Sequence, residues 1–231
     1  MTQRLRVTFS RGEEAKYISH LDMMRFWERA FRRAHLAVAR SQGFHPHPRI
    51  ALAAPLPVGV IADAELMDVY LEEALDPLGF YRALAAQLVP SIRVSAVEEV
   101  PNDLPSLQAS MRFADYRVVV ETERSAEDIR AAIVALVALD SFMWEHLRDG
   151  ETRRYDLRAQ IAELELDRWE NGIATLKTRL QMDVAGAGRP EQVAKALGFD
   201  EPPLSVHRTR LILDDQKSGR PVRPPIAGGR H

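Results

Sequence analysis

Four arginines are spaced so that a helix would place them on one side. They are Arg25, Arg29, Arg32 and Arg33, at positions i, i+4, i+7 and i+8, and such spacings share a helix face. Each guanidinium offers a planar fork of donors that matches phosphate oxygens. The spacing therefore predicts a phosphate-binding stripe. The alternative is a solvated face, partly neutralised by Glu28 and by other acids.

The segment 41–49 follows this stripe and combines rings with hydrogen-bonding groups. One glycine and two prolines within nine residues predict a shaped loop. Phe and His rings stack on unpaired bases, Gln reads a base edge and Arg holds phosphate, so the mixture is typical of single-stranded or looped RNA binding. The alternative is a structural turn whose Phe44 fills the core. The candidate RNA-binding residues here are Arg40, Gln42, Phe44, His45, His47 and Arg49.

Three histidines are candidates for chemistry. A metal site from His20, His45 and His47 is one interpretation, because the His-x-His of His45 and His47 is a usable ligand pair, but the spacing specifies no third ligand and no metal is expected. The same histidines are candidates for a general acid and base in metal-free RNA cleavage. Ser19 and Asp22 predict a helix N-cap rather than a nucleophile and its partner.

Charge and cysteine usage limit the possible chemistry. The chain has no cysteine, which excludes thiolate zinc sites, cysteine nucleophiles and any iron–sulfur cluster held by its own thiolates. No cofactor is expected. Residues 1–60 contain ten Lys or Arg and four Asp or Glu, a net charge of +6, whereas residues 61–110 carry −7. This asymmetry points to a polyanion site in the first segment.

Apolar periodicity predicts the elements that must position these residues. In the first hundred residues we expect strands over 4–10, 50–54, 64–72 and 92–100, and helices over 21–34 and from 77 to the stop at Pro90. This order is β-α-β-β-α-β. A similar order is expected later, with strands over 116–121, 142–146, 155–166, 173–182 and 206–213, and helices over 126–139 and 190–197.

These elements predict an α+β chain of two tandem ferredoxin-like modules with antiparallel sheets. The expected domains are 1–100, a linker over 101–115, a second module over 116–213, and a disordered tail over 214–231 rich in Gly, Pro and Arg. No apolar run approaches the length that spans a bilayer, and the first residues lack the apolar core of a secretory signal. We therefore expect a cytoplasmic protein without a membrane partner.

The chain resembles the radical-SAM-linked conserved proteins, a bacterial domain-of-unknown-function family. The resemblance rests on residues 17–25 (YISHLDMMR), 28–34 (ERAFRRA), 41–48 (SQGFHPHP) and 55–59 (PLPVG), with a weaker likeness at 155–158 (YDLR). It implies a radical SAM protein as partner and does not imply a known activity. The doubled module order is also similar to the tandem ferredoxin-like RNA-binding proteins of CRISPR systems, which is an analogy of fold alone.

Three hypotheses follow. In the first, the chain is an accessory RNA-binding protein that presents rRNA or tRNA to a radical SAM partner for modification or processing. In the second, it is a metal-independent endoribonuclease that uses His20, His45 or His47. In the third, it is a protein-binding scaffold whose basic face docks an acidic partner.

Overall fold

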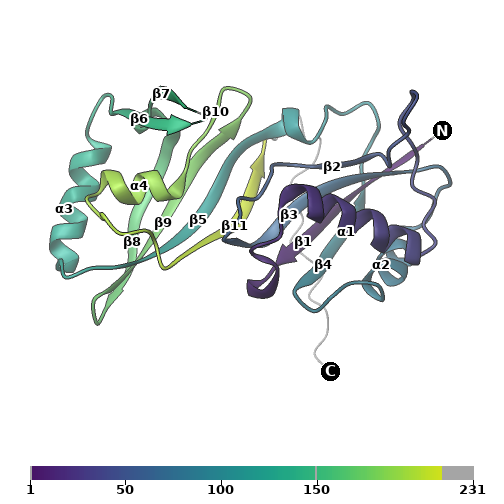
Figure 1. Ribbon diagram of the computed structural model, residues 1–231, viewed down its shortest axis with the longest axis horizontal. Helices are drawn as coiled ribbons and strands as arrows, with labels where there is room; N and C mark the ends of the chain where they lie inside the picture. The colour runs from purple at the N-terminus through teal and green to yellow at the C-terminus, as the bar shows by residue number, and fades with distance from the viewer. Residues whose placement is uncertain (1, 149, 215–231) are drawn as a thin grey trace. The chain divides into compact units, whose positions relative to one another are not determined.

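The computed structural model describes residues 2–148 and 150–214. These residues contain four α-helices and mostly antiparallel strand pairs, so the chain is of mixed α+β class (Figure 1). They divide into two compact units. The first unit comprises residues 2–111 with Leu213 and Asp214, and the second comprises residues 112–148 and 150–212.

The first unit has the predicted β-α-β-β-α-β order. Its elements are β1 (Gln3–Arg11), the 3₁₀ helix η1 (Glu13–Ala15), α1 (His20–Arg33), β2 (Ile50–Leu52), β3 (Val60–Leu71), α2 (Pro77–Ala85), β4 (Ile92–Glu99) and the 3₁₀ helix η2 (Gln108–Ser110). The strands lie in the order β2–β3–β1–β4, and each neighbouring pair is antiparallel.

One face of this sheet forms the core of the first unit. Leu5, Val7 and Phe9 alternate along β1 and are buried, as period-two patterning requires. Trp27 of α1 is completely buried, and its ring centroid lies 4.9 Å from that of Phe9. Both helices contribute to this core, so α1 has a fixed position on the sheet and its opposite side faces solvent.

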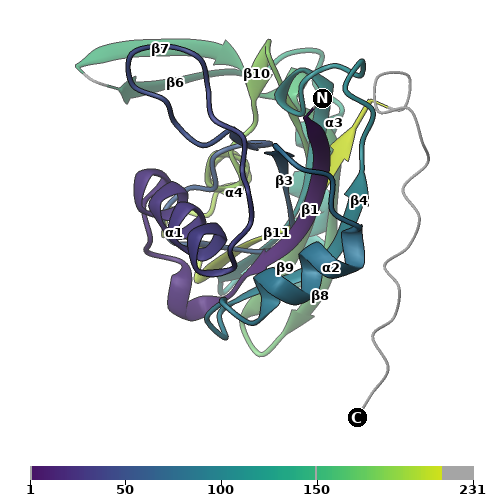
Figure 2. The ribbon, with the colours of Figure 1, turned by 90° about the vertical axis from the view of Figure 1, so that its right-hand side faces the viewer.

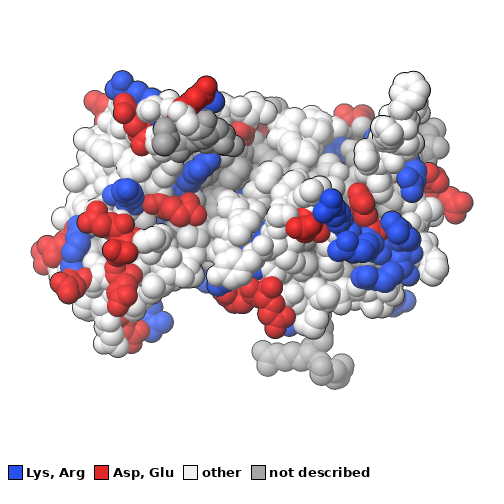
Figure 3. Space-filling view, viewed as in Figure 1, with Lys and Arg blue, Asp and Glu red and all other residues white. Residues whose placement is uncertain are grey.

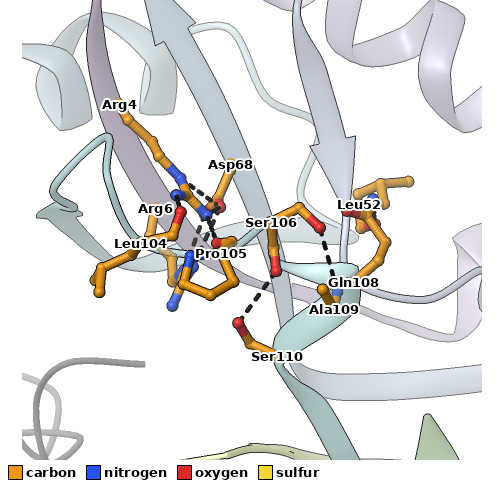
Figure 4. Close-up of polar contacts among 10 residues, drawn as sticks. All are labelled: Arg4, Arg6, Leu52, Asp68, Leu104, Pro105, Ser106, Gln108, Ala109 and Ser110. Atoms are coloured by element: carbon orange, nitrogen blue, oxygen red, sulfur yellow. Dashed lines mark hydrogen bonds and ion pairs between the residues drawn. The ribbon is translucent and has the colours of Figure 1, made fainter. Parts of the chain in front are cut away.

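The other face carries a buried ionic cluster (Figure 4). Asp68 of β3 is fully buried, and its Oδ2 accepts hydrogen bonds from Nε and Nη2 of Arg4 at 2.9 and 2.6 Å. Arg6 Nε donates to the other carboxylate oxygen at 2.8 Å. Buried charges persist only when they are paired and hydrogen-bonded. Arg4 and Arg6 of β1 meet this requirement for Asp68, and their hydrogen bonds join β1 to β3.

The segment 101–110, part of the linker expected over 101–115, is attached to the same face. The Arg4 guanidinium also donates to the carbonyl oxygens of Leu104 and Pro105, each at 2.9 Å. Further along, the Gln108 side chain donates to the Leu52 carbonyl at 2.6 Å, as Figure 4 shows. The segment therefore binds Arg4, the partner of Asp68, and through Gln108 it also binds the edge strand β2.

The second unit has a related order with extra strands. Its elements are β5 (Met111–Glu121), α3 (Ala126–Val137), β6 (Met143–Arg148), β7 (Glu151–Asp156), the 3₁₀ helix η3 (Arg158–Gln160), β8 (Ile161–Glu170), β9 (Ile173–Asp183), β10 (Gly186–Ala187), α4 (Pro190–Ala196) and β11 (Ser205–Leu213). Four strands lie in the order β8–β9–β5–β11, β10 also pairs with β9, and β6 and β7 form a separate hairpin.

The prediction of one strand over 155–166 is wrong. The chain leaves β7 at Asp156 and makes η3 before β8 begins. Asp156 Oδ1 accepts hydrogen bonds from the backbone N–H groups of Phe142, Arg158 and Ala159. An Asp side chain that captures backbone donors in this way competes with a strand ladder, and the alternation of apolar residues does not reveal it.

The finer assignments have different outcomes. The α+β class and the antiparallel pairing are confirmed, whereas the ferredoxin-like character of the two modules stays a prediction. The expected disordered tail lies outside the described residues except for Asp214, whose N–H donates to the Ser110 carbonyl at 2.7 Å. Across residues 2–148 and 150–214, no helix has both the length and the apolar character needed to cross a membrane.

We predict that Asp68→Ala lowers the free energy of unfolding by about 3–5 kcal/mol, because the substitution leaves two arginines without their buried partner. Glu73→Ala, which removes an exposed carboxylate five residues later, should change it by less than about 0.5 kcal/mol. Urea denaturation of both variants measures the difference. Equal midpoints would show that the cluster does not stabilise the fold.

Candidate nucleic-acid interface

Helix α1 begins at the predicted cap. The Ser19 hydroxyl accepts a hydrogen bond from the backbone N–H of Asp22 at 3.2 Å and donates to its carboxylate at 2.7 Å. The hydrogen bond from Ser19 is the main cause that lowers the pKa of Asp22, and Arg25 adds to the effect. The side chains of Ser19 and Asp22 thus cap the first turn of α1.

The sequence of α1 separates an apolar side from a basic one. Met23, Trp27, Ala30 and Phe31 are buried against the sheet. The four predicted arginines are all exposed, and Figure 3 shows Lys and Arg side chains gathered over this helix. We call Arg25, Arg29, Arg32 and Arg33 the basic face.

The partners of the basic face leave most of its donors accessible. Arg25 Nη1 lies 3.3 Å from Asp22 Oδ1, and both side chains are more than half exposed. This ion pair therefore contributes little to the stability of the fold. Arg33 donates to the Gln87 carbonyl at 2.8 Å. The side chains of Arg29 and Arg32 make no hydrogen bond or ion pair to any residue that the structure describes. Their charges face solvent.

The chain leaves α1 through a Schellman motif. His35 has a positive φ of 53°, and the N–H groups of His35 and Leu36 donate to the carbonyls of Arg32 and Phe31. The following segment then attaches to β3, because Ala39 N–H donates to the Tyr70 carbonyl at 2.7 Å and Tyr70 N–H donates to the Arg49 carbonyl at 3.1 Å. Both stems of loop 41–49 are therefore fixed by one residue of β3.

Loop 41–49 is closed at its neck. Ser41 N–H donates to the His47 carbonyl at 2.8 Å, and His47 N–H donates to the Ser41 hydroxyl at 3.0 Å. The Arg40 side chain reaches the Pro46 carbonyl at 3.1 Å. Arg49 places its guanidinium 4.0 Å from the centre of the Tyr70 ring, a cation–π contact. The conformation of the neck therefore does not depend on the residues at the tip.

Phe44 lies at the tip of this loop and is fully exposed, with a relative accessibility of 102%. The alternative in which Phe44 fills the core is wrong. Burial of such a ring stabilises a fold by about 1.5–3 kcal/mol, and this chain forgoes that gain. Gln42, His45 and His47 are exposed as well. Figure 2 shows α1 and the chain that follows it on the same side of β1 and β3.

The three candidate histidines form no metal centre with other ligands. Within residues 2–148 and 150–214, no group of three His, Cys, Asp or Glu side chains is arranged to hold a metal ion. His20 does not lie on the loop with His45 and His47; it is the first residue of α1 and lines a pocket beneath that helix.

That pocket contains two charged residues that the sequence interpretation did not single out. Arg11 is 2% exposed and Glu65 is 4% exposed. The signal in the sequence is the spacing of two residues between Glu65, Met67 and Val69, which places them on one side of β3. In the β1–β3 register Glu65 pairs with Phe9, so this side faces the core. A buried carboxylate at such a position persists when it is paired, and Glu65 is not without a partner.

Side chains of the second unit also bind backbone groups. Arg158 donates to the carbonyls of Val137 and Ile161, each at 2.9 Å. Trp169 is 41% exposed, and its indole N–H donates to the Arg124 carbonyl. These contacts organise the second unit locally.

Comparison with known protein families matches residues 4–194 to the model described as "Uncharacterized protein conserved in bacteria (DUF2344)". The chain belongs to this family. The match covers all four arginines of the basic face, loop 41–49 and both charged residues of the pocket. No curated protein matches the chain.

Three solved structures are similar to the chain at 10–13% identity. They are a structure of an H/ACA RNP bound to a substrate RNA containing 2′-deoxyuridine (10% identity, TM-score 0.45), the archaeal box H/ACA sRNP Nop10–Cbf5 complex (13%, 0.44) and a Cbf5–Nop10–Gar1 complex (11%, 0.46). Each alignment covers 90% of this chain and 47–48% of the other. The chain therefore spans about half the length of those chains.

We predict a pH-dependent contribution from the cap of α1. The pKa of Asp22 is lower in the folded chain, so its ionised form favours folding. This contribution is complete above the unfolded pKa of about 3.9 and is lost as the pH falls through the folded pKa. The difference in Tm between wild type and Asp22→Asn should be present at pH 7 and should narrow below about pH 4.

The Ser19→Ala background provides the control, because it removes the main cause of the shift. In that background Asp22→Asn should change Tm less, and the change should depend less on pH. A difference in Tm that stays constant from neutral to acidic pH would contradict this description of the cap.

Proposed function

We propose that this member of the DUF2344 family is an accessory protein that binds single-stranded or looped RNA through the basic face of α1 and loop 41–49. The observation that carries the proposal is the fully exposed Phe44 on a loop whose neck is closed by its own hydrogen bonds. The loop follows directly from the helix that carries Arg29 and Arg32. Stacking groups and phosphate ligands thus belong to one continuous segment.

The basic face supplies the electrostatic part of this binding. Exposed guanidiniums without protein partners remain hydrated until a polyanion displaces their counterions, and release of counterions from the nucleic acid drives association. Arg25 and Arg33 already have weak or backbone partners, so Arg29 and Arg32 are the residues on which phosphate binding should depend most. Their fork geometry suits phosphate oxygens.

Loop 41–49 supplies contacts to bases. An aromatic ring in solvent offers a face to any unpaired base, and stacking of this kind is worth about 1–3 kcal/mol per base. His45, His47 and Gln42 surround Phe44 in the sequence and add polar groups that reach base edges. A double helix would hide these edges, so the proposal is specific for unpaired RNA.

The partner and the RNA class form the finer part of the proposal. The resemblance to radical-SAM-linked proteins supports a radical SAM enzyme as partner and rRNA or tRNA as the RNA. Because the chain has no cysteine, the cluster of such an enzyme would be held by the partner. The tandem ferredoxin-like assignment is supported by the corresponding strand orders β2–β3–β1–β4 and β8–β9–β5–β11.

Replacing Arg29 and Arg32 with alanine should weaken RNA binding and its dependence on salt. For single-stranded nucleic acid, log affinity falls with log salt by about 0.7 per phosphate contact, so loss of two contacts should make the slope shallower by about 1.4. Fluorescence anisotropy with a labelled RNA oligomer over a salt series measures this slope.

Arg117→Ala/Arg130→Ala is the matched control. The side chains of these two arginines of the second unit are also exposed and make no hydrogen bond or ion pair to the described residues. The control should retain the wild-type slope. The same slope in both double variants would contradict binding at α1, and cleavage of the RNA in EDTA that His45→Ala/His47→Ala abolishes would favour the endoribonuclease hypothesis instead.

Phe44→Ala should reduce affinity about 5- to 150-fold, the range for loss of one stacked base, and should leave the salt slope unchanged. Phe44→Trp should retain most of the affinity, since the larger ring also stacks. Tm should be unaffected by either substitution because the ring is fully exposed. Unchanged affinity in a folded Phe44→Ala protein would remove the loop from the interface.

A further inference from the structure

Three exposed apolar residues lie near the start of α1. Tyr17 is 71% exposed, Leu21 is 58% exposed and Val58 is 59% exposed. The Gly59 N–H donates to the Lys16 carbonyl at 2.7 Å, so the segment that carries Val58 lies beside the one that carries Tyr17. Apolar side chains that gather on a surface, unlike scattered ones, mark an interaction site.

The backbone that carries Tyr17 is fixed from beneath. Arg11 is 2% exposed, and its guanidinium donates to the carbonyls of Ala15, Lys16 and Ile18 at 2.8, 2.7 and 2.6 Å. One buried side chain thus holds the residues on both sides of Tyr17, while the ring of Tyr17 remains in solvent. A ring on such a backbone loses little conformational freedom when it binds a ligand.

The Tyr17 ring is also oriented by its neighbour. Lys16 Nζ lies 5.3 Å from the centre of this ring, within the range of a cation–π contact, and it donates to the Glu13 carboxylate at 2.6 Å. The contact leaves most of the ring exposed. Tyr17 therefore shares with Phe44 the property of an exposed aromatic ring on a backbone held by hydrogen bonds, and such rings stack on unpaired bases.

The backbone anchors of Tyr17 and Phe44 lie at opposite ends of α1. Arg11 holds the segment before α1, and Arg4 pairs with the residue of β3 that binds both stems of loop 41–49. These two arginines are seven residues apart on β1, about 23 Å. The fourteen residues of α1 span about 21 Å. In Figure 1 the chain enters α1 at its left end and leaves it at its right end, so the basic face lies between the two anchors.

The charges beside Tyr17 favour an RNA strand as the occupant of this surface. Leu21 precedes Arg25 by four residues and Arg29 by eight, so its side chain continues the same stripe of α1. A ligand that follows this stripe meets apolar contacts first and guanidiniums next. Bases joined by phosphates suit this combination, because the bases stack and the phosphates bind the cations.

We propose that one RNA strand runs along α1 and stacks one base on Tyr17 and another on Phe44, with its phosphates on the basic face. This inference rests on the proposed function and adds a second ring and a defined length to it. Phosphates of a stacked strand follow one another at about 3.4 Å, so about seven nucleotides span the distance between the anchors and a stretched strand needs fewer. A trinucleotide spans about 7 Å at this spacing and, even at twice that length, cannot reach both rings.

The test measures binding of a uridine dodecamer by fluorescence anisotropy. Tyr17→Ala should reduce its affinity about 5- to 150-fold, the range for loss of one stacked base, and should leave the salt slope unchanged. Tyr17→Phe should retain most of the affinity, since its ring also stacks. Tyr81→Ala is the matched control, because Tyr81 is an exposed tyrosine of α2, and it should bind as the wild type does. Tm should change little in all three variants.

The length of the oligomer tests whether one strand contacts both rings. A dodecamer reaches both rings and loses a contact when either is removed. A uridine trinucleotide, measured as a competitor of the labelled dodecamer, binds at one ring at a time, so Phe44 remains available to it when Tyr17 is removed. Tyr17→Ala should therefore weaken binding of the trinucleotide far less than binding of the dodecamer. Equal fold-losses for the two lengths would overturn the proposed path of the strand.

Three other outcomes have distinct meanings. Unchanged dodecamer affinity in folded Tyr17→Ala, together with the expected losses in Phe44→Ala and Arg29→Ala/Arg32→Ala, would overturn this inference alone. If the wild type binds no RNA, the proposed function fails and this inference fails with it. If sedimentation shows a dimer that Tyr17→Ala dissociates while RNA affinity is unchanged, the surface belongs to a second copy of the chain and its assignment to RNA is overturned.

Discussion

The buried carboxylate of Asp68 is the constraint on which the first unit depends. It accepts hydrogen bonds from Arg4 and Arg6, and Arg4 in turn donates to the carbonyls of Leu104 and Pro105. A charge at this depth would cost several kcal/mol without such partners. The cluster therefore fixes β1 against β3 and holds the segment after β4 on the same face. The opposite face remains free to pack against α1 and α2.

Strand β3 carries this constraint to the candidate interface. Two residues after Asp68, the backbone of Tyr70 binds both stems of loop 41–49, and its ring lies beneath Arg49. Three residues before Asp68, Glu65 lines the pocket next to α1. One strand thus positions the loop and the pocket, while the packing of Trp27 positions the basic face. The groups proposed to contact RNA are held by buried interactions at their bases and are exposed at their ends.

Local patterns in the sequence were sufficient to predict most of the helices and strands. They were insufficient to predict which side chains are buried. The Ser19 cap and the arginine spacing predicted α1 and its exposed side, because both depend on helix periodicity alone. The exposure of Phe44 was not predictable, since the same ring could have filled the core. Glu65 was missed because period-two alternation does not reveal which charged position a helix will cover. Asp156 broke an expected strand through side-chain hydrogen bonds that apolar periodicity does not encode.

The most direct test of the central claim is to map photocrosslinks between the chain and a bound RNA oligomer that contains 4-thiouridine. Mass spectrometry of the crosslinked peptides identifies the residues in contact with bases. RNA binding as proposed predicts crosslinks within loop 41–49, with Phe44 among them. Crosslinks confined to residues 112–212 would contradict it and would place the RNA on the second unit.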